Sequence, residues 1–178
     1  MKTNLTIALL ACLFLNTTAH AEWMPDPDNK LQLAARKTVA SVLDANPDLQ
    51  VYMDEAYAFA VFPSVVKGAA FWGVTYGKGI VIVADEVVGN CSQISMDLGP
   101  QAGGQLFEQI IFFRSKAALQ EFQKGRLEFQ GRAGVAVANK GVNATPSHLP
   151  EVAIVTKTRM GLLFHAAAGA TKFRYQAL

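Results

Sequence analysis

Hydrophobic and polar residues alternate with a helical period near the start of the chain. In residues 30–45, "KLQLAARKTVASVLDA", the apolar side chains recur at positions three or four apart while charged residues lie between them. This pattern predicts an amphipathic helix that packs on its own domain. Asp28 or Asn29 can cap it, and it should end before Pro47.

Two further helices are predicted from local signals. A short one should begin at Asn46, with Pro47 at its first helical position, and include "DLQVYMDEA". The segment "SKAALQEFQK" predicts another, with Ser115 as the N-terminal cap and Gly125 as its stop.

The pattern changes at Tyr57, where β-branched and aromatic residues become frequent and glycines separate the apolar runs. The strand candidates are "YAFAVF", "GAAFWGVTYGKGIVIVA", "SQISMDL", "GQLFEQIIFF", "RLEFQGRAGVAVA" and "EVAIVTKTRMGLLFHAAAGATKFRY". We read the second of these as two extended segments around a glycine-rich corner. Many strands and few helices predict an α+β domain with a mainly antiparallel sheet that is strongly curved and could even be barrel-like. An N-terminal helical segment and one or two further helices complete the predicted fold.

The first 21 residues predict an export signal rather than a part of the fold. Lys2 provides a basic start, "LTIALLACLFL" an apolar core and "AHA" a small-residue cleavage site. We therefore expect residues 1–21 to be removed, leaving a single domain over residues 22–178 in the periplasm or cell envelope. Cys12 within "LLAC" offers the alternative of a lipoprotein, which is disfavoured because the apolar run continues past it to a better cleavage site. If cleavage follows Ala21, Cys91 is the only cysteine left and no internal disulfide can form.

Charge is distributed unevenly although the formal net charge is only +2. Residues 22–55 are acidic overall, whereas residues 56–178 are basic. A basic strand region suits an anionic partner such as a lipid headgroup. Export and the small net charge argue against nucleic acid as the partner.

The stretch "FWGVTYGKGIV" looks like a phosphate-binding loop but fails the chemical test. Gly73 and Gly77 are one residue too close, and Gly79 stands where a magnesium-binding hydroxyl is required. The β-branched residues that follow predict a strand, whereas a phosphate loop needs a helix N-terminus. We therefore exclude nucleotide binding and predict a hairpin corner with Lys78 exposed near its tip.

Residues suited to catalysis or metal binding are few. His148 and His165 have no cysteine or carboxylate at metal-ligand spacing, so no metal or cofactor is expected. Cys91 and His165 form the only conceivable nucleophile and base pair. Asp85 and Glu86 are neighbours in a predicted strand and should point to opposite faces. We predict that the protein is not an enzyme.

Several blocks of the sequence resemble one family. "YAFAVFPSVVKGAAFWGVTYGKGIV", "QLFEQIIFFRSKAALQEFQKGRLEFQGRAGVAVA" and the terminal "KFRYQAL" are similar, in this order, to the SYLF domain of exported bacterial proteins. The likeness runs from about Leu31 to Leu178, with the family's V-F-P-S-x-x-K-G block at residues 61–68 and its G-K-G turn at residues 77–79. The family more often has glycine at Ala69 and Ala70, and lysine and glycine where residues 159–161 read Arg, Met and Gly. The resemblance implies phospholipid binding without fixing the headgroup.

These observations lead to three functional hypotheses. The first is an exported, non-enzymatic protein that binds anionic phospholipid or a membrane surface through a basic, aromatic-containing face. The second is a cell-envelope module that binds a protein partner or polymer through the same sheet, and the third is an enzyme of unknown type. The lipid-binding candidates are four cations, which would attract phosphates, and two aromatic residues, which would lie at the interface: Lys67, Lys78, Arg159, Lys172, Phe71 and Trp72.

Overall fold

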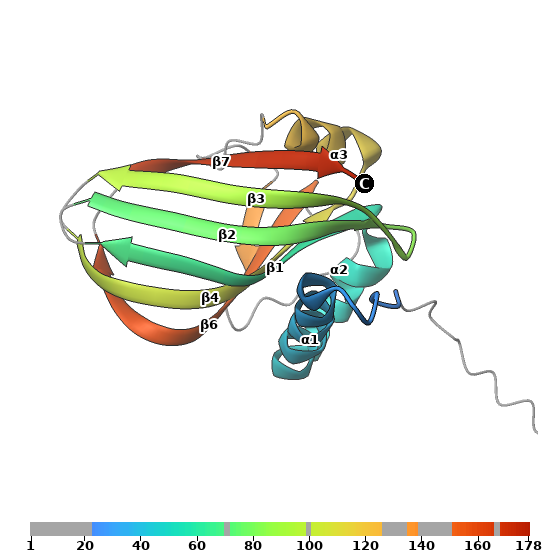
Figure 1. The fold of residues 1–178 in the computed structure, drawn as a ribbon, viewed down its shortest axis with the longest axis horizontal. Coiled ribbons are helices and arrows are strands. Elements are labelled where there is room, and N and C mark those ends of the chain that lie inside the picture. Colours follow the sequence, from blue (N-terminus) through green and yellow to red (C-terminus); the bar gives the residue numbers. More distant parts are fainter. Residues whose placement is uncertain (1–22, 70–71, 99–100, 126–134, 139–150, 166–167) are drawn as a thin grey trace, which may run out of the picture.

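The computed structural model describes residues 23–69, 72–98, 101–125, 135–138, 151–165 and 168–178. The predicted signal peptide, Cys12 and Glu22 therefore lie outside the described residues. The elements, shown in Figure 1, are α1 (Lys30–Ala45), η1 (Pro47–Leu49), α2 (Gln50–Glu55), β1 (Ala58–Ala69), β2 (Trp72–Val83), β3 (Glu86–Leu98), β4 (Gln101–Phe113), α3 (Lys116–Gln123), β5 (Val135–Ala138), β6 (Val152–His165) and β7 (Ala168–Ala177). They confirm the predicted α+β class.

The helices begin and end at the predicted signals. Asn29, rather than Asp28, caps α1, because its side-chain oxygen accepts hydrogen bonds from two backbone N–H groups of the first turn at 3.1 and 3.2 Å. Pro47 is the first residue of η1. The Ser115 hydroxyl accepts a backbone N–H of α3 at 3.2 Å, and Gly125 follows that helix with a φ of +69°. Local capping chemistry thus sets the helix boundaries.

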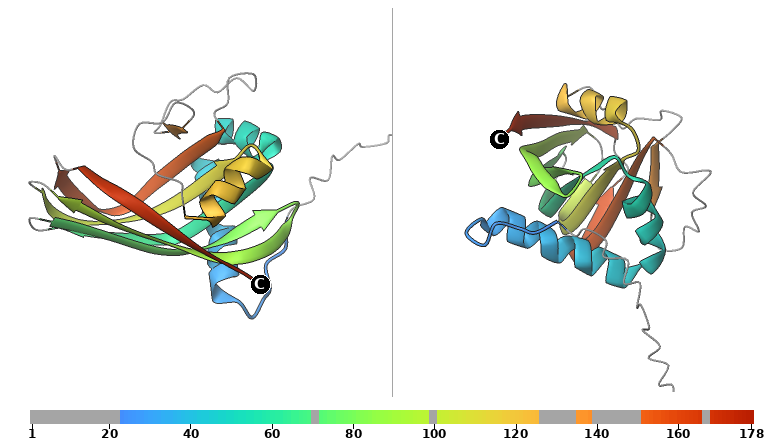
Figure 2. Two further views of the ribbon diagram at one scale, coloured as in Figure 1. Left: turned by 90° about the horizontal axis from the view of Figure 1, so that it is seen from above. Right: turned by 90° about the vertical axis from the view of Figure 1, so that its right-hand side faces the viewer.

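The seven strands lie in the order β5-β6-β4-β1-β2-β3-β7, and each neighbouring pair is antiparallel except β5 and β6. His165 ends β6 and Ala168 begins β7, so the ends of these strands lie within about 11 Å although four strands separate them in the sheet. The sheet must therefore curl strongly, as Figure 2 shows.

The barrel-like closure suggested by the sequence is wrong. Strands β5 and β7 are the two edges of the sheet and do not pair with each other. Helix α3 lies on the concave side and contacts both β4 and β7 (Figure 2). Because this helix fills the space between the two arms of the sheet, the strands at that end stay too far apart to form hydrogen bonds.

The predicted hairpin corner is also misplaced. Residues 77–79 lie in the middle of β2, paired with β1 on one side and β3 on the other, so Lys78 is not at a tip. The reversal between β1 and β2 lies instead between Ala69 and Trp72. A side chain at Gly79 would place its Cβ 2.4 Å from the Val61 carbonyl oxygen. Gly79 is therefore required by the close approach of β1, where the pairing register shifts, and not by a turn.

A two-residue turn joins β2 to β3. Ala84 and Asp85 have φ angles of 47° and 63°, which is the left-handed conformation that tight hairpins require. Asp85 thus belongs to the turn, and Glu86 begins β3. The prediction that both lie within one strand is wrong for Asp85.

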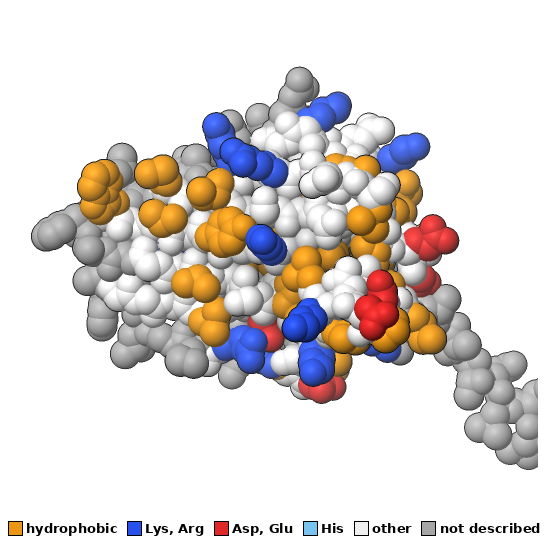
Figure 3. Space-filling view, in the orientation of Figure 1, with side chains coloured by type: hydrophobic (Ala, Val, Ile, Leu, Met, Phe, Trp, Pro, Cys, Tyr) orange, Lys and Arg blue, Asp and Glu red, His pale blue; other side chains and the backbone are white. Residues whose placement is uncertain are grey.

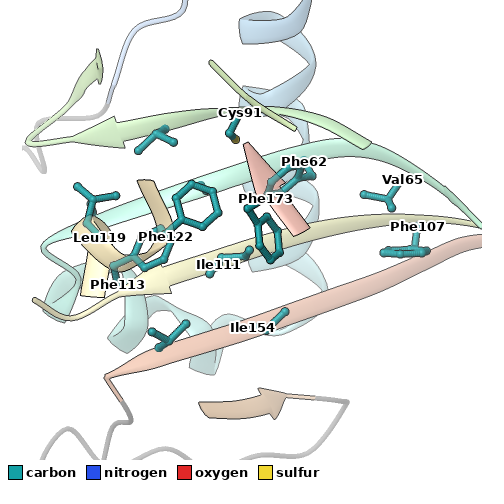
Figure 4. Packing of buried hydrophobic residues seen from close by; sticks show 14 residues of the cluster. Phe62, Val65, Cys91, Phe107, Ile111, Phe113, Leu119, Phe122, Ile154 and Phe173 are labelled. Carbon is teal, nitrogen blue, oxygen red and sulfur yellow. The ribbon is translucent and has the colours of Figure 1, made fainter. Parts of the chain in front are cut away.

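Hydrophobic side chains pack on both faces of the sheet at one end. We call the convex face the outer face, where α1 packs on β1 and β2 in a cluster that includes Val61, Ile80 and Ile82. Helix α2 joins the same cluster through Tyr52, whose ring centroid lies 5.8 Å from that of Phe112. On the concave, inner face, α3 packs through Phe122, whose ring centroid lies 5.0 Å from that of Phe113 and 5.1 Å from that of Phe173 (Figure 4). We call the other end the distal half, defined as residues 66–69, 72–76 and 94–98 of β1, β2 and β3. No helix of the described chain covers its outer face (Figure 1).

Candidate functional site

Side chains of β2 alternate sharply between the two faces. Residues 73, 75, 77 and 79 are buried and point to the inner face, whereas residues 72, 74, 76 and 78 are exposed on the outer face. The buried set consists of three glycines and a threonine, but the exposed set reads Trp, Val, Tyr, Lys. The larger side chains of this half-strand thus lie on the solvent side, which is the reverse of the usual arrangement in a sheet with one covered face.

The exposed apolar side chains form a patch over three strands. Val66 of β1 is paired with Tyr76 of β2, and Tyr76 is paired with Ile94 of β3. In the next row toward the strand ends, Val74 is paired with Met96. We call these residues the apolar patch: Val66 (55% exposed), Trp72 (65%), Val74 (47%), Tyr76 (48%), Ile94 (42%) and Met96 (60%). Figure 3 shows orange side chains gathered on this half of the molecule.

Three cations border the apolar patch on the same face. Lys172 of β7 lies opposite Ile94, within a row of the patch. Lys78 and Arg174 lie in the following row, on either side of Ser92. All three cations are exposed, and within the described residues none of them forms an ion pair. The outer face therefore changes from apolar to basic along the strand direction.

A groove lies at this boundary. It encloses about 660 Å³ between the start of α1 and the strands β2, β3 and β7. Its lining comprises Leu31, Tyr76, Lys78, Gly79, Asn90, Cys91, Ser92, Arg174, Tyr175 and Gln176. Among these lining residues, two are cationic and none is acidic.

The predicted lipid-binding residues do not share one surface. Trp72, Lys78 and Lys172 come together on the outer face. Lys67 is paired with Thr75, whose side chain points to the inner face, so Lys67 lies on the opposite side of the sheet from Lys78. This arrangement follows from strand alternation, which sequence distance alone did not reveal.

Of the other two candidates, the structure describes Arg159 but not Phe71. Arg159 sits at an irregularity in the pairing of β6 with β4, where its Nε lies 3.7 Å from Oε1 of the buried Glu108. It is therefore engaged in an ion pair away from the apolar patch. Phe71 lies outside the described residues.

Six of the nine side chains of this outer surface were not predicted from the sequence. The register brings Val66, Val74, Tyr76, Ile94, Met96 and Arg174 beside Trp72, Lys78 and Lys172. The signal was present in "WGVTYGK", where every second residue is large and the residues between are small. Because the stretch was interpreted as a corner, this period of two was not used.

The structure separates the candidate nucleophile Cys91 from the candidate base His165. His165 ends β6 close to Ala168 of β7, which is paired with Leu98, and Cys91 lies seven residues from Leu98 along β3, which corresponds to roughly 20 Å. Burial raises the pKa of the Cys91 thiol well above its ordinary value, which keeps it protonated. His148 lies outside the described residues. In the described part of the chain, no group of three or more His, Cys, Asp or Glu residues is placed to hold a metal ion.

Comparison with family models and with curated proteins gives no match. The chain matches no known family model, and no curated protein resembles it at a significant level. The likeness to the SYLF domain stays a prediction. Among the described residues, no helix combines the length and the apolar character needed to cross a bilayer.

Proposed function

We propose that this chain is an exported, non-enzymatic protein of the SYLF type that associates peripherally with anionic phospholipid. The observation that carries the proposal is the apolar patch bordered by Lys78, Lys172 and Arg174 on one uncovered face. A contiguous patch of exposed apolar side chains on a folded domain marks an interaction site, whereas single scattered apolar residues on a surface do not.

The chemistry of the face favours a lipid surface as the partner. Trp72 and Tyr76 are the residue types that lie at the boundary between hydrocarbon and headgroups. Lys172 lies in the row of Tyr76, and Lys78 and Arg174 lie one row farther from Trp72, at the level where phosphates would be met if the distal end of the sheet entered the interface. Each such cation contributes about 1 kcal/mol to association with an anionic surface. The burial of Cys91 and its separation from His165 along β3 support the non-enzymatic part of the proposal.

Vesicle co-sedimentation tests the proposal. The protein should begin at Glu22, because the apolar residues before it would bind vesicles by themselves. We expect binding to vesicles of phosphatidylcholine mixed with an equal part of phosphatidylglycerol, and much weaker binding to phosphatidylcholine alone. The double variant Lys78→Gln/Lys172→Gln should lose about 25-fold in partition coefficient, since each cation contributes about 1 kcal/mol.

Lys116→Gln is the matched control. It removes the same charge from α3, which lies on the inner face, and should change binding less than twofold. Equal losses in Lys116→Gln and in Lys78→Gln would show attraction by net charge alone and would contradict the proposed face.

Tryptophan fluorescence gives a second, site-specific measurement. The protein has two tryptophans, of which Trp23 is buried and Trp72 is 65% exposed. In a Trp23→Phe variant, the emission of Trp72 should shift to shorter wavelength on vesicle binding and be quenched by brominated lipid. If the protein does not bind vesicles but recovers one stoichiometric protein from envelope extract, and this recovery depends on the apolar patch, the partner is a protein and not a lipid.

A further inference from the structure

The groove at the boundary of the apolar patch has the chemistry of a site for a phosphate group. Lys78, Ser92 and Arg174 lie in one row across β2, β3 and β7, with the small serine between the two cations. Neighbouring strands are about 4.8 Å apart, so the two cationic residues start roughly 10 Å apart on either side of Ser92. Their long side chains can both reach a group held above the serine.

The rest of the lining supplies hydrogen-bonding groups and no competing negative charge. Asn90 and Gln176 lie opposite each other in the next row, and Tyr76 lies in the row on the side of the apolar patch. No described acidic side chain lines the groove or forms an ion pair with Lys78 or Arg174, so among the described residues the groove is cationic.

Helix α1 adds to the positive potential. Leu31, the second residue of this helix, lines the groove, so the positive end of the helix dipole lies beside it. The N–H groups of Leu31 and Gln32 already donate to Asn29, so α1 acts through its field and the direct donors are the side chains.

We propose that this groove binds a phosphate group through Lys78 and Arg174, with Ser92 leaving the space that the phosphate occupies. The inference deepens the proposed function and rests on it for the source of the phosphate, which would be a phospholipid headgroup. A general attraction between a basic surface and a membrane needs no such groove, and therefore the two ideas can be tested separately.

Binding of a monomeric lipid tests the groove without a membrane. The probe is dihexanoyl phosphatidylglycerol below its critical micelle concentration, and the readout is the set of backbone amide NMR shifts of the protein beginning at Glu22. Saturable shifts should centre on residues 78, 92 and 174. Lys78→Gln and Arg174→Gln should each weaken binding about fivefold or more, as expected for one cation at an anionic group. Lys116→Gln should leave it unchanged, and Lys172→Gln, outside the lining, should cost less than Lys78→Gln.

The Ser92→Leu variant tests whether binding needs the space of the groove as well as its charge, because leucine fills the groove while both cations remain. Its side chain lies on the outer face away from the two cores, and an unchanged melting temperature would verify that the variant folds. We expect this variant to abolish the saturable shifts. Equal losses of affinity in Lys78→Gln and Lys172→Gln, or unchanged affinity in Ser92→Leu, would contradict the proposal that the groove binds the phosphate group.

Two further arms identify the source of the phosphate. If inorganic phosphate saturates the groove with the same affinity as the lipid probe, the groove is a site for free phosphate, and the proposal that it binds a lipid headgroup is contradicted. Vesicle binding that depends on Trp72 but is unchanged in Ser92→Leu would overturn the groove while leaving the membrane function intact. Binding of the soluble lipid without any vesicle association would support the groove and contradict the membrane function.

Discussion

Substitution of Gly79 by alanine should destabilise the fold for a steric reason, and the same substitution at Gly68 provides the matched control. A Cβ at Gly79 would lie 2.4 Å from the Val61 carbonyl oxygen, 2.9 Å from Cδ1 of Phe62 and 3.1 Å from Sγ of Cys91. The nearest of these atoms belongs to the backbone and cannot rotate away. A Cβ at Gly68, also within a strand, would meet no atom within 4 Å.

The two alanine variants should therefore change stability in opposite directions. Overpacking a well-filled core costs about 1–3 kcal/mol, and a clash with backbone places Gly79→Ala in the upper part of that range. Replacing glycine by alanine where the backbone and the space allow it stabilises by about 0.4–1 kcal/mol, because the unfolded chain loses freedom. We expect Gly68→Ala to show this gain, so the two variants should differ by about 2–4 kcal/mol.

Urea unfolding followed by circular dichroism measures the difference. The slope of the free energy of unfolding against urea should be the same in both variants, so that a shift in midpoint reports stability alone. Thermal unfolding should place Gly79→Ala below the parent by about 2–4 °C for each kcal/mol lost. A Gly79→Ala variant as stable as Gly68→Ala would refute the close packing of β1 on β2 and with it the placement of residues 77–79 inside a strand.

Two other predictions concern the inner core. Phe122→Ala removes a fully buried ring that lies against Phe113 and Phe173, and should lower the free energy of unfolding by about 3–5 kcal/mol; a loss below about 1 kcal/mol in urea unfolding would contradict the packing of α3. Burial raises the pKa of Cys91, so its thiol stays protonated in the folded protein but ionises near 9.0 when unfolded. The stabilising contribution of the buried thiol is therefore present below that pH and is lost as the pH rises above it. In urea titrations, the difference in free energy of unfolding between the parent and Cys91→Ala should shrink between about pH 8 and about pH 10. A constant difference would argue against burial of the thiol.

Local signals in the sequence predicted the helices well. Asn29, Pro47, Ser115 and Gly125 act through neighbours within one or two turns, so their effect can be read without knowing the fold. The strand content was equally clear from composition. The α+β class could therefore be predicted, whereas the arrangement of the strands could not.

The errors have one physical origin, which is the set of contacts between distant strands. Gly79 resembled a turn residue because nothing nearby in the sequence shows that Val61 packs against it. The sheet was expected to be able to close because the sequence does not show that α3 lies on the concave side, between β4 and β7. Lys67 and Lys78 looked equivalent as cations in one basic segment, but the pairing of β1 with β2 sends them to opposite faces. Arg174 joined the outer surface only through the pairing of β7 with β3.

On the uncovered outer face of the distal half, the residues available for binding a partner are not the residues that stabilise the fold. The exposed residues of this face, such as Trp72, Val74 and Met96, belong to neither hydrophobic core, so their replacement removes little buried area. Mutations there can alter what the protein binds at small cost to the folded state. Related chains could therefore diverge in target along these strands while keeping the same scaffold, and a saturation library of this face should retain folded protein at most positions.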